Sequence, residues 1–508
     1  MKTAIPSGGA LLLAPALVIA AVAAGFLPLL FFALSRGGQF SLDAYVWRVL
    51  GFTLMQASLS TLISIALALP AARALAFRKF PGRNILLALF AVPQALPAIV
   101  VVLALVELYG QSGWFAGLFN VYGLSGILLA HVFFNLPLAV RFFVEAIETA
   151  QPESLRLAEQ LGFRTFAHWR HIEWPALRPV LPRVAALIFL LCASSFVVVL
   201  TLGGPSSTTL DVAIYQSLRL DFDVTRAVTL AIIQVVLCVA LVLMAGQVAA
   251  PVASTQRLRM TTAKVSSRDP FGMLTLVATV LLVVPPLLAL LGSGLSHFNL
   301  RPVLLQAMAT SFLLASLSAL LCMVLAWPLS LLQVRQPKWR GAVSAVALLG
   351  LMLPPAVLAT GWFILIGGLA TGKASSIALI ASLNALMSLP FYTTILGGSM
   401  THVVPHHDRL CAQLGLMGWQ RLWRIDAPAL ARPLAQGFLM AFVLSFGDLT
   451  AVMLLGSSGL ITLPSLIASE MGQFRSANAQ GTALLLAALC LAGSLLANRL
   501  SRPESRTT

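Results

Sequence analysis

The sequence predicts an all-α polytopic membrane protein, with about 12 transmembrane helices arranged as two tandem halves of six. Of its 508 residues, 59% are apolar and only 9% are charged. The apolar residues gather in repeated runs of about 20, the length that a helix needs to cross a bilayer. Backbone groups inside lipid must bond within their own segment, which also favours helices. A polar, basic segment also occurs twice, once in each half.

Twelve apolar segments are predicted along the chain. The first six lie near residues 11–34, 47–72, 86–108, 123–146, 183–203 and 226–249. The second six lie near residues 272–294, 303–332, 343–369, 375–398, 434–456 and 479–498. The first segment is longer than the apolar core of a cleaved signal peptide, so we expect it to be a retained helix.

These segments divide the chain into two membrane halves joined by a polar linker. We expect the first half at residues 1–253, with its transmembrane domain at about 47–250. The linker is expected at 254–270, where the sequence is basic and rich in Ser and Thr. The second half is expected at 271–508, with its transmembrane domain at about 303–499.

The net charge of +16 comes from an excess of Lys and Arg, and in membrane proteins such residues gather in the cytoplasmic loops. With the N-terminus in the cytoplasm, 25 of the 32 Lys and Arg residues fall on the inner side. We therefore expect both termini, the linker and both repeated polar segments to be cytoplasmic. In a soluble protein this charge would suggest a nucleic-acid partner, but here we expect none.

Short sequence matches show that the two halves repeat one another. The residues Ala57–Ser60 (ASLS) recur at Ala315–Ser318, and Pro97 recurs with its following alanine at Pro355, both 258 residues later. Farther along each half the offset is 253, as for Pro137 and Pro390. Because six helices return each half to its starting side, the two halves face the membrane in the same direction.

The repeated polar segments are RLAEQLGFRTFAHWRHIEWPAL (Arg156–Leu177) and RLCAQLGLMGWQRLWRIDAPAL (Arg409–Leu430), which we call the first and second repeated loops. Each predicts two short helices. Gly162 and Gly415 suit the left-handed position that ends a helix. Prolines 152 and 405 are expected in the first turn of the first short helix. Prolines 175 and 428 limit the second short helix.

The second short helix of each loop carries apolar residues at three-residue spacing: Phe166, Trp169 and Ile172, then Trp419, Leu422 and Ile425. Such a ridge could lie on anionic lipid headgroups or dock into a cytoplasmic partner. The equal glycine-to-proline spacing in both loops favours docking, because a headgroup-binding helix needs only amphipathicity. Glu173 and Asp426 occupy the same place in both loops. They could pair with a basic partner residue, or stay solvated or paired within the loop.

The glycine followed at fixed spacing by Ile-x-x-Pro resembles the EAA loop of type I ABC importer permeases. The matching residues are Ala158, Gly162, Ile172 and Pro175, then Gly415, Ile425 and Pro428. The resemblance implies a permease whose two loops bind separate ATPase subunits. Those partners would hold ATP and Mg, so this chain is expected to bind no cofactor. Arg156 and Arg409 replace the glutamate of that family, which removes one expected polar contact to the ATPase.

The similarity extends over nearly the whole chain, including the segments Tyr122–Arg141, Ala185–Gly204 and Arg432–Gly456. These segments resemble thiamine and thiamine pyrophosphate importer permeases of Gram-negative bacteria. The resemblance implies an inner-membrane location, a periplasmic substrate-binding protein as partner, and translocation of thiamine or its phosphate esters into the cytoplasm. Ferric iron or another small solute remains the alternative cargo. A gradient-driven secondary transporter is the rival class, but it has no use for two matched docking loops.

Two carboxylates are candidates for the translocation path, because charge within a membrane usually faces a cavity. Asp448 lies within the eleventh segment and Glu107 at the outer end of the third. The alternative for each is a carboxylate bonded to a neighbouring helix. The segment GGLATGKAS (Gly367–Ser375) approaches a phosphate-binding loop, but it lies between apolar helices rather than between a strand and a helix. We therefore expect no ATP site, no metal site and no catalytic residues in this chain.

Overall fold

The computed structural model describes residues 8–35, 42–77, 81–111, 113–117, 119–148, 160–161, 165–204, 206–245, 270–366, 372–416, 418–457 and 459–501. Within these residues every regular element is a helix. Eight helices are long and apolar enough to span a membrane, and four further helix pairs meet the same test but are bent at a short break. Counting each bent pair as one span gives up to twelve, which agrees with the predicted number, although two of these pairs include a helix of a repeated loop, at Trp169–Leu177 and at Gly418–Ala429. The all-α polytopic fold class is confirmed.

The helices of the first half are α1 (Gly8–Ser35), α2 (Ala44–Phe77), α3 (Arg83–Leu89), α4 (Val92–Ala95), α5 (Ala98–Tyr109), α6 (Leu124–Glu148), α8 (Thr165–His168), η1 (Trp169–Glu173), α9 (Trp174–Leu177), α10 (Leu181–Ala193), α11 (Val197–Leu202), α12 (Leu210–Arg219) and α13 (Val224–Ala245). The predicted linker lies, apart from Pro270, outside the described residues.

The helices of the second half are α14 (Pro270–Ser296), α15 (Pro302–Arg335), η2 (Pro337–Trp339), α16 (Arg340–Met352), α17 (Pro355–Ile366), α18 (Lys373–Gln413), α19 (Gly418–Arg421), η3 (Leu422–Asp426), α20 (Ala427–Ala429), α21 (Ala431–Phe446), α22 (Thr450–Leu455), α23 (Leu463–Gly472) and α24 (Ser476–Leu500).

Hydropathy predicted the third segment of each half as one continuous span. In the structure this segment is instead a helix broken at proline. In the first half the chain bends by 108° before α5, and in the second by 80° before α17. Leu96 and Leu353, which precede Pro97 and Pro354, both have extended backbone conformations. A proline disfavours helical geometry in the residue before it and cannot donate a helical hydrogen bond. The apolar pattern continues through both breaks, so hydropathy alone did not reveal them.

Hydrogen bonds between distant helices recur at the offsets of the sequence repeat. The Thr53 hydroxyl accepts a hydrogen bond from the Leu210 amide at 3.1 Å, which ties α2 to the start of α12. In the second half the Ser311 hydroxyl accepts from the Leu463 amide at 2.8 Å, which ties α15 to the start of α23. The two halves therefore share their internal packing as well as their helix order.

The two halves exchange their first helices. Helix α1 packs against α17 and α15 of the second half, whereas α14 packs against α2 and α5 of the first. The α1–α17 contact is close, because a Cβ added to Gly361 would lie 1.6 Å from the Gly25 carbonyl oxygen. Next to it the Trp362 indole donates a hydrogen bond to the Ala21 carbonyl at 3.0 Å. Small residues of this kind let membrane helices approach closely.

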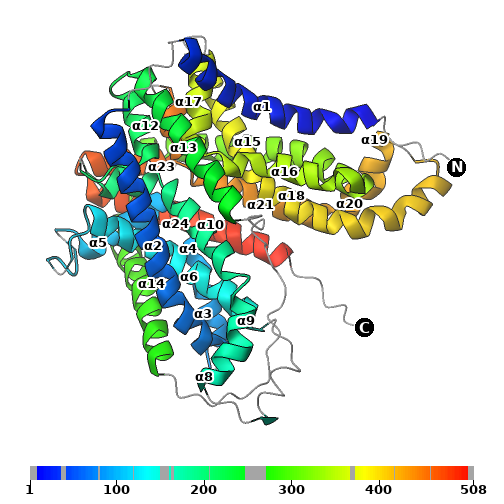
Figure 1. Ribbon diagram of the computed structural model, residues 1–508. Coiled ribbons are helices and arrows are strands. Elements are labelled where there is room, and N and C mark those ends of the chain that lie inside the picture. The colour runs from blue at the N-terminus through cyan, green and yellow to red at the C-terminus, as the bar shows by residue number, and fades with distance from the viewer. Residues whose placement is uncertain are drawn as a thin grey trace.

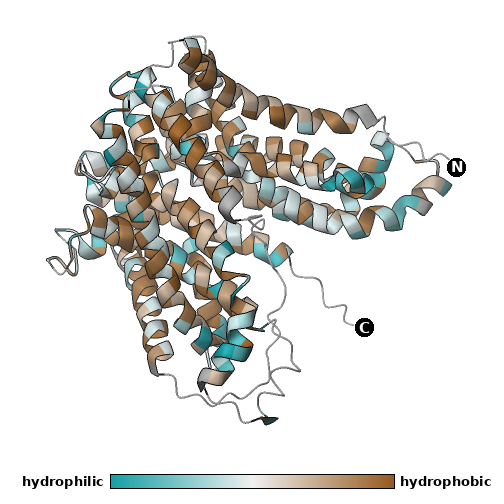
Figure 2. Ribbon diagram, in the orientation of Figure 1, coloured by the Kyte–Doolittle hydropathy of each residue, from teal (hydrophilic) through white to brown (hydrophobic). Residues whose placement is uncertain are grey.

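The molecule forms two arms that meet at one end (Figure 1). One arm carries α1, α15, α16 and α18 and ends at α19 and α20, and the other carries α2, α3, α6 and α14 and ends at α8 and α9. Figure 2 shows hydrophilic residues at those two ends and again near α12 and α23, with mainly apolar residues along the helices that connect these regions. We call the side with both repeated loops the loop side and the opposite side, near α12 and α23, the far side.

Gly361→Ala is expected to destabilise the fold, because the new methyl group meets the backbone of Gly25 and neither helix can yield by a side-chain rotation. Overpacking of this kind costs about 1–3 kcal/mol. The measurement is the thermal unfolding midpoint of the purified protein in detergent. Gly398→Ala in α18, where nothing lies within 4 Å, is the matched control and is expected to be neutral or stabilising. Equal midpoints for both variants would contradict the close α1–α17 contact.

Candidate coupling loops and interhelical pocket

The second repeated loop begins at the end of an unbroken helix, not with a separate short helix. The prediction that Pro405 lies in a first helical turn is wrong, because α18 runs through it to Gln413. The helix ends as predicted at Gly415, which has a positive φ of 63°. The Gly415 amide donates to the Ala412 carbonyl and the Leu416 amide to the Cys411 carbonyl, the two bonds of a Schellman cap. Pro152, Ala158 and Gly162 in the first loop lie outside the described residues.

The predicted second short helix of each loop contains a widened, π-helical turn. It is η1 in the first loop and η3 in the second. The Trp174 amide donates to the carbonyl of Trp169, and the Ala427 amide donates to that of Leu422, each five residues back. The next residue in each loop is a proline, whose ring would crowd the carbonyl four residues before it in a regular α-helix. Single π-helical turns are rare in proteins overall, but those that occur are frequently found at functional sites.

Each loop presents a pair of exposed tryptophans, which we call the tryptophan pairs. In the first loop the rings of Trp169 and Trp174 lie 5.5 Å apart, and their side chains are 38% and 37% exposed. In the second the rings of Trp419 and Trp423 lie 5.7 Å apart, with 72% and 60% exposed. Trp174 and Trp423 were missed by the sequence analysis, which assumed a regular helix with three-residue spacing. The π-helical turn places Trp169 and Trp174, which are five residues apart, on the same face, whereas Trp419 and Trp423 are four residues apart, the spacing of neighbours on a regular α-helix.

The aliphatic residues of the predicted ridges lie between solvent and the helix bundle. Ile172 is half-buried and packs against the core that α2, α6 and α10 form. Leu422 and Ile425 are likewise half-buried, and Pro175 and Pro428 are exposed. Phe166 lies in α8, directly before η1. The aliphatic residues therefore fix each loop to its own half, while the tryptophan pair faces outward.

Glu173 is buried and paired within its own chain. Its carboxylate lies 2.9 Å from the Arg73 Nε atom at the end of α2 and 2.8 Å from the His168 Nδ1 atom. Of the alternatives that the sequence left open, the structure supports an intramolecular partner. Glu173 links the first repeated loop directly to α2.

Asp426 occupies the equivalent position in the second loop and is also buried. Its carboxylate lies 3.0 Å from the Nε atom of Arg421, which stands where His168 stands in the first loop. Arg421 also contacts Asp408 at 2.7 Å, and Asp408 contacts Arg335, the last residue of α15, at 3.0 Å. The second loop is therefore linked to the end of α15 as the first is linked to α2.

Both candidate path carboxylates have partners within the protein. Asp448 lies in the break between α21 and α22, where its oxygens accept hydrogen bonds from the amides of Thr450 at 3.1 Å and Ala451 at 3.0 Å. These hydrogen bonds satisfy amides at the start of α22. They agree with the alternative interpretation, in which the carboxylate bonds to the protein rather than to the cargo. Glu107 accepts a hydrogen bond from the Gln480 side chain of α24. The contact joins the two halves.

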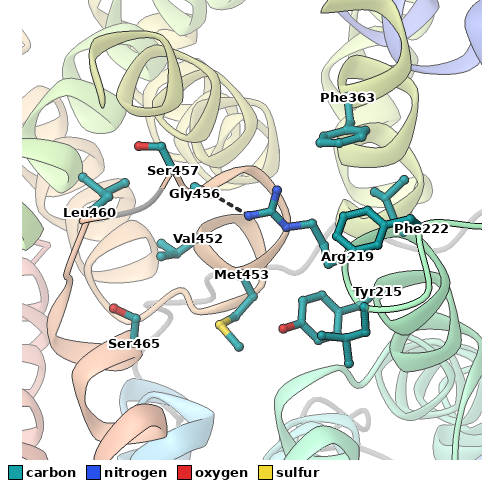
Figure 3. Close-up of a pocket in the computed structure, with 12 residues that line it drawn as sticks. Tyr215, Arg219, Phe222, Phe363, Val452, Met453, Gly456, Ser457, Leu460 and Ser465 are labelled. Atoms are coloured by element: carbon teal, nitrogen blue, oxygen red, sulfur yellow. Dashed lines mark hydrogen bonds between the residues drawn. The ribbon is translucent and has the colours of Figure 1, made fainter. Parts of the chain in front are cut away.

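A pocket of about 460 Å³ lies between the two halves on the far side (Figure 3). Arg219 crosses it from α12 and donates a hydrogen bond to the Gly456 carbonyl at 2.7 Å. Its guanidinium carbon also lies 6.0 Å from the centre of the Phe363 ring. Neither Asp448 nor Glu107 lines this pocket, whose walls include Tyr215, Phe222, Val452, Met453, Ser457, Leu460 and Ser465.

Glu173→Gln is expected to destabilise the protein by about 3 kcal/mol, because removing one charge of a buried pair leaves the other uncompensated. The double variant with Arg73→Gln should cost less than the sum of the two single variants, by about 1 kcal/mol or more. Unfolding of the purified protein in detergent measures all three. Asp221→Asn, at an exposed carboxylate, is the control. Strict additivity of the Arg73 and Glu173 changes would show that the pair does not hold the loop.

The sequences of known proteins are similar to this one along most of the chain. The family of binding-protein-dependent transport system inner membrane components matches residues 63–252 and 323–502, once in each half. The thiamine transport system permease protein ThiP of Escherichia coli (strain K12) is 41% identical over 475 residues, which cover 88% of each chain. ThiP of Brucella abortus (strain 2308) is 38% identical over 524 residues, 97% of this chain and 95% of that one. ThiP of Haemophilus influenzae is 34% identical over 88% of this chain and 87% of its own.

The double family match agrees with the repeated hydrogen bonds and with the two equivalent loops. The relatives are matched over nearly their full length, so the similarity covers both halves and the junction between them. The chain belongs to the binding-protein-dependent inner membrane components, and it is a multi-pass permease of the ATP-binding-cassette importer class with both membrane units in one polypeptide.

Proposed function

We propose that this permease carries thiamine or its phosphate esters into the cytoplasm, energised by separate ATPase subunits. The observation that carries the cargo is the similarity to thiamine transport permeases over almost the whole chain. The observation that carries the energy source is the pair of equivalent loops, each with exposed tryptophans on a helix tied to its own half. A carrier driven by an ion gradient has no need for such loops.

The proposed orientation places the loop side in the cytoplasm. With both termini there, 25 of the 32 basic residues lie on the inner side, as the positive-inside rule requires. The far side, with α12, α23 and the pocket between the halves, then faces the periplasm. There a soluble substrate-binding protein delivers the cargo.

Each tryptophan pair is proposed to insert into a groove of one ATPase subunit. Flat aromatic rings on a short helix suit such a groove, because they bury a large apolar area with few rotatable bonds. ATP and Mg bind to those subunits and not to this chain. When the ATPase subunits move, the Arg73–Glu173 pair makes α2 follow the first loop, and the Arg335–Asp408–Arg421 network makes α15 follow the second. A displacement at the loops is thereby passed to the long helices of both arms.

The cargo is tested by uptake of labelled thiamine at nanomolar concentration in cells with and without this gene. We expect uptake to disappear on deletion and to return with the intact gene. Unchanged uptake in a cell without another thiamine importer would contradict the proposed cargo and leave ferric iron as the next solute to test.

The same uptake assay tests whether the charge of Asp448 contributes to the path. Asp448→Asn keeps an acceptor for the amides of α22 but removes the charge. Normal uptake by this variant would exclude a role for the Asp448 charge in the path.

The docking loops are tested by replacing each tryptophan pair with alanine, as Trp169→Ala with Trp174→Ala, or Trp419→Ala with Trp423→Ala. We expect either double variant to lose the ATPase subunit on purification and to abolish uptake, because docking residues of this type dominate interface energies. Trp114→Ala is the matched control, since that side chain is 61% exposed but lies in the loop after α5 on the far side. Retention of the ATPase by both double variants would refute the docking role.

A further inference from the structure

Two exposed phenylalanines stand at equivalent turns on the far side of the molecule. Phe222 lies between α12 and α13, and Phe474 between α23 and α24. Their side chains are 78% and 93% exposed. They are also the two non-glycine residues with positive φ in the described part of the chain, at 54° and 58°. We call Phe222 and Phe474 the aromatic anchors.

The two turns occupy the same place in the repeat. Helices α12 and α23 begin 253 residues apart, and the aromatic anchors are 252 residues apart. Backbone hydrogen bonds close both turns, from the Asp223 amide to the Ser217 carbonyl at 2.8 Å and from the Arg475 amide to the Glu470 carbonyl at 2.9 Å. The left-handed conformation is therefore built into each turn.

This arrangement is unfavourable for the isolated chain in two ways. A bulky residue with positive φ is strained, because its Cβ atom crowds its own backbone. A phenylalanine ring in water also forgoes the free energy that burial would provide. Glycine or asparagine would fill either turn without strain. Strain that recurs at equivalent places points to a function of the side chain that occupies them.

The neighbours of the aromatic anchors are polar, so the rings stand in water rather than in lipid. Asp221 and Asp223 flank Phe222, and Gln473 and Arg475 flank Phe474. Two carboxylates beside the first ring would be costly within hydrocarbon. Phe222 also lines the pocket between the two halves, next to Arg219 and Tyr215 (Figure 3). The first anchor thus stands where a delivered solute would enter.

We propose that Phe222 and Phe474 are the two residues on which the soluble substrate-binding protein docks, one anchor for each half of the permease. The inference rests on the proposed function, and the family itself is described as binding-protein-dependent. An exposed aromatic ring surrounded by polar groups is the usual centre of a protein–protein contact. One partner that spans both halves needs one such contact on each, which two repeat-related anchors supply.

The charges beside the anchors differ and fix the orientation of the partner. The first anchor is flanked by acidic residues, and the second by the basic residue Arg475. Asp223 already lies 3.8 Å from Arg226, so the exposed Asp221 is the acidic group presented beside Phe222. The partner is therefore expected to carry a basic residue that faces Asp221 and an acidic residue that faces Arg475. Complementary charges of this kind select one of two possible orientations on a pseudo-symmetric surface.

The test uses the complete transporter, permease with ATPase subunits, in lipid nanodiscs with the purified thiamine-binding protein of the same cell. Phe222→Gly and Phe474→Gly remove the rings and relieve the positive φ, so both proteins should fold at least as well as the unmodified permease. We expect each to weaken binding of the thiamine-binding protein about tenfold, and to lower its stimulation of ATP hydrolysis. Phe298→Gly, a less exposed phenylalanine before α15 on the same side, is the control and should bind normally.

Normal binding by both anchor variants, or an equal loss in Phe298→Gly, would overturn the docking role while leaving the proposed function intact. Failure of the unmodified transporter to bind the thiamine-binding protein, together with absence of thiamine uptake, would overturn the proposed function and this inference with it. Arg475→Glu adds a second readout, since its effect on affinity should shrink as salt screens the charge.

Discussion

The exchange of first helices between the halves is the contact on which the rest of the structure depends. Helix α1 completes the second half through Gly25, Gly361 and the Trp362–Ala21 hydrogen bond, and α14 completes the first half along α2. Lipid tails are as apolar as the helices, so close packing and hydrogen bonds hold membrane helices together rather than the hydrophobic effect. Without α1 the second half would lack the helix that covers α17 and α15, and without α14 the first half would lack the helix that covers α2 and α5. The two arms are joined at the far side.

The broken helices bring the two halves together near the centre of the molecule. The backbone of Gly447, between α21 and α22, packs directly on Pro97, between α4 and α5, because an added Cβ would lie 2.7 Å from the proline ring. One break thus lies against a break of the other half. From there the arms diverge toward the repeated loops, and ion pairs link each loop to α2 or α15.

The two halves keep the same geometry with different chemistry. His131 contacts Ser60 in the first half, and at the equivalent place Asn384 and Ser445 bond toward Ser318 in the second. In the repeated loops, histidine pairs with glutamate on one side and arginine with aspartate on the other. In a fused chain the two copies of a repeated position are separate residues, so the side chain in one half can change independently of its equivalent in the other half. The two loops and the two far-side turns thereby become chemically distinct surfaces on one pseudo-symmetric frame.

The sequence by itself determined the twelve apolar segments, the parallel repeat and the position of both loops, because hydropathy and residue spacing are local properties. The cap at Gly415 was also predicted, since a left-handed glycine leaves a local signal. Only the tertiary structure decided that α18 continues through Pro405, that the third segments bend, and that α1 and α14 change places. It also assigned Glu173 to Arg73, 100 residues away. An apolar helix carries no local mark of its neighbour, so these contacts follow from side-chain shape and hydrogen bonding in three dimensions.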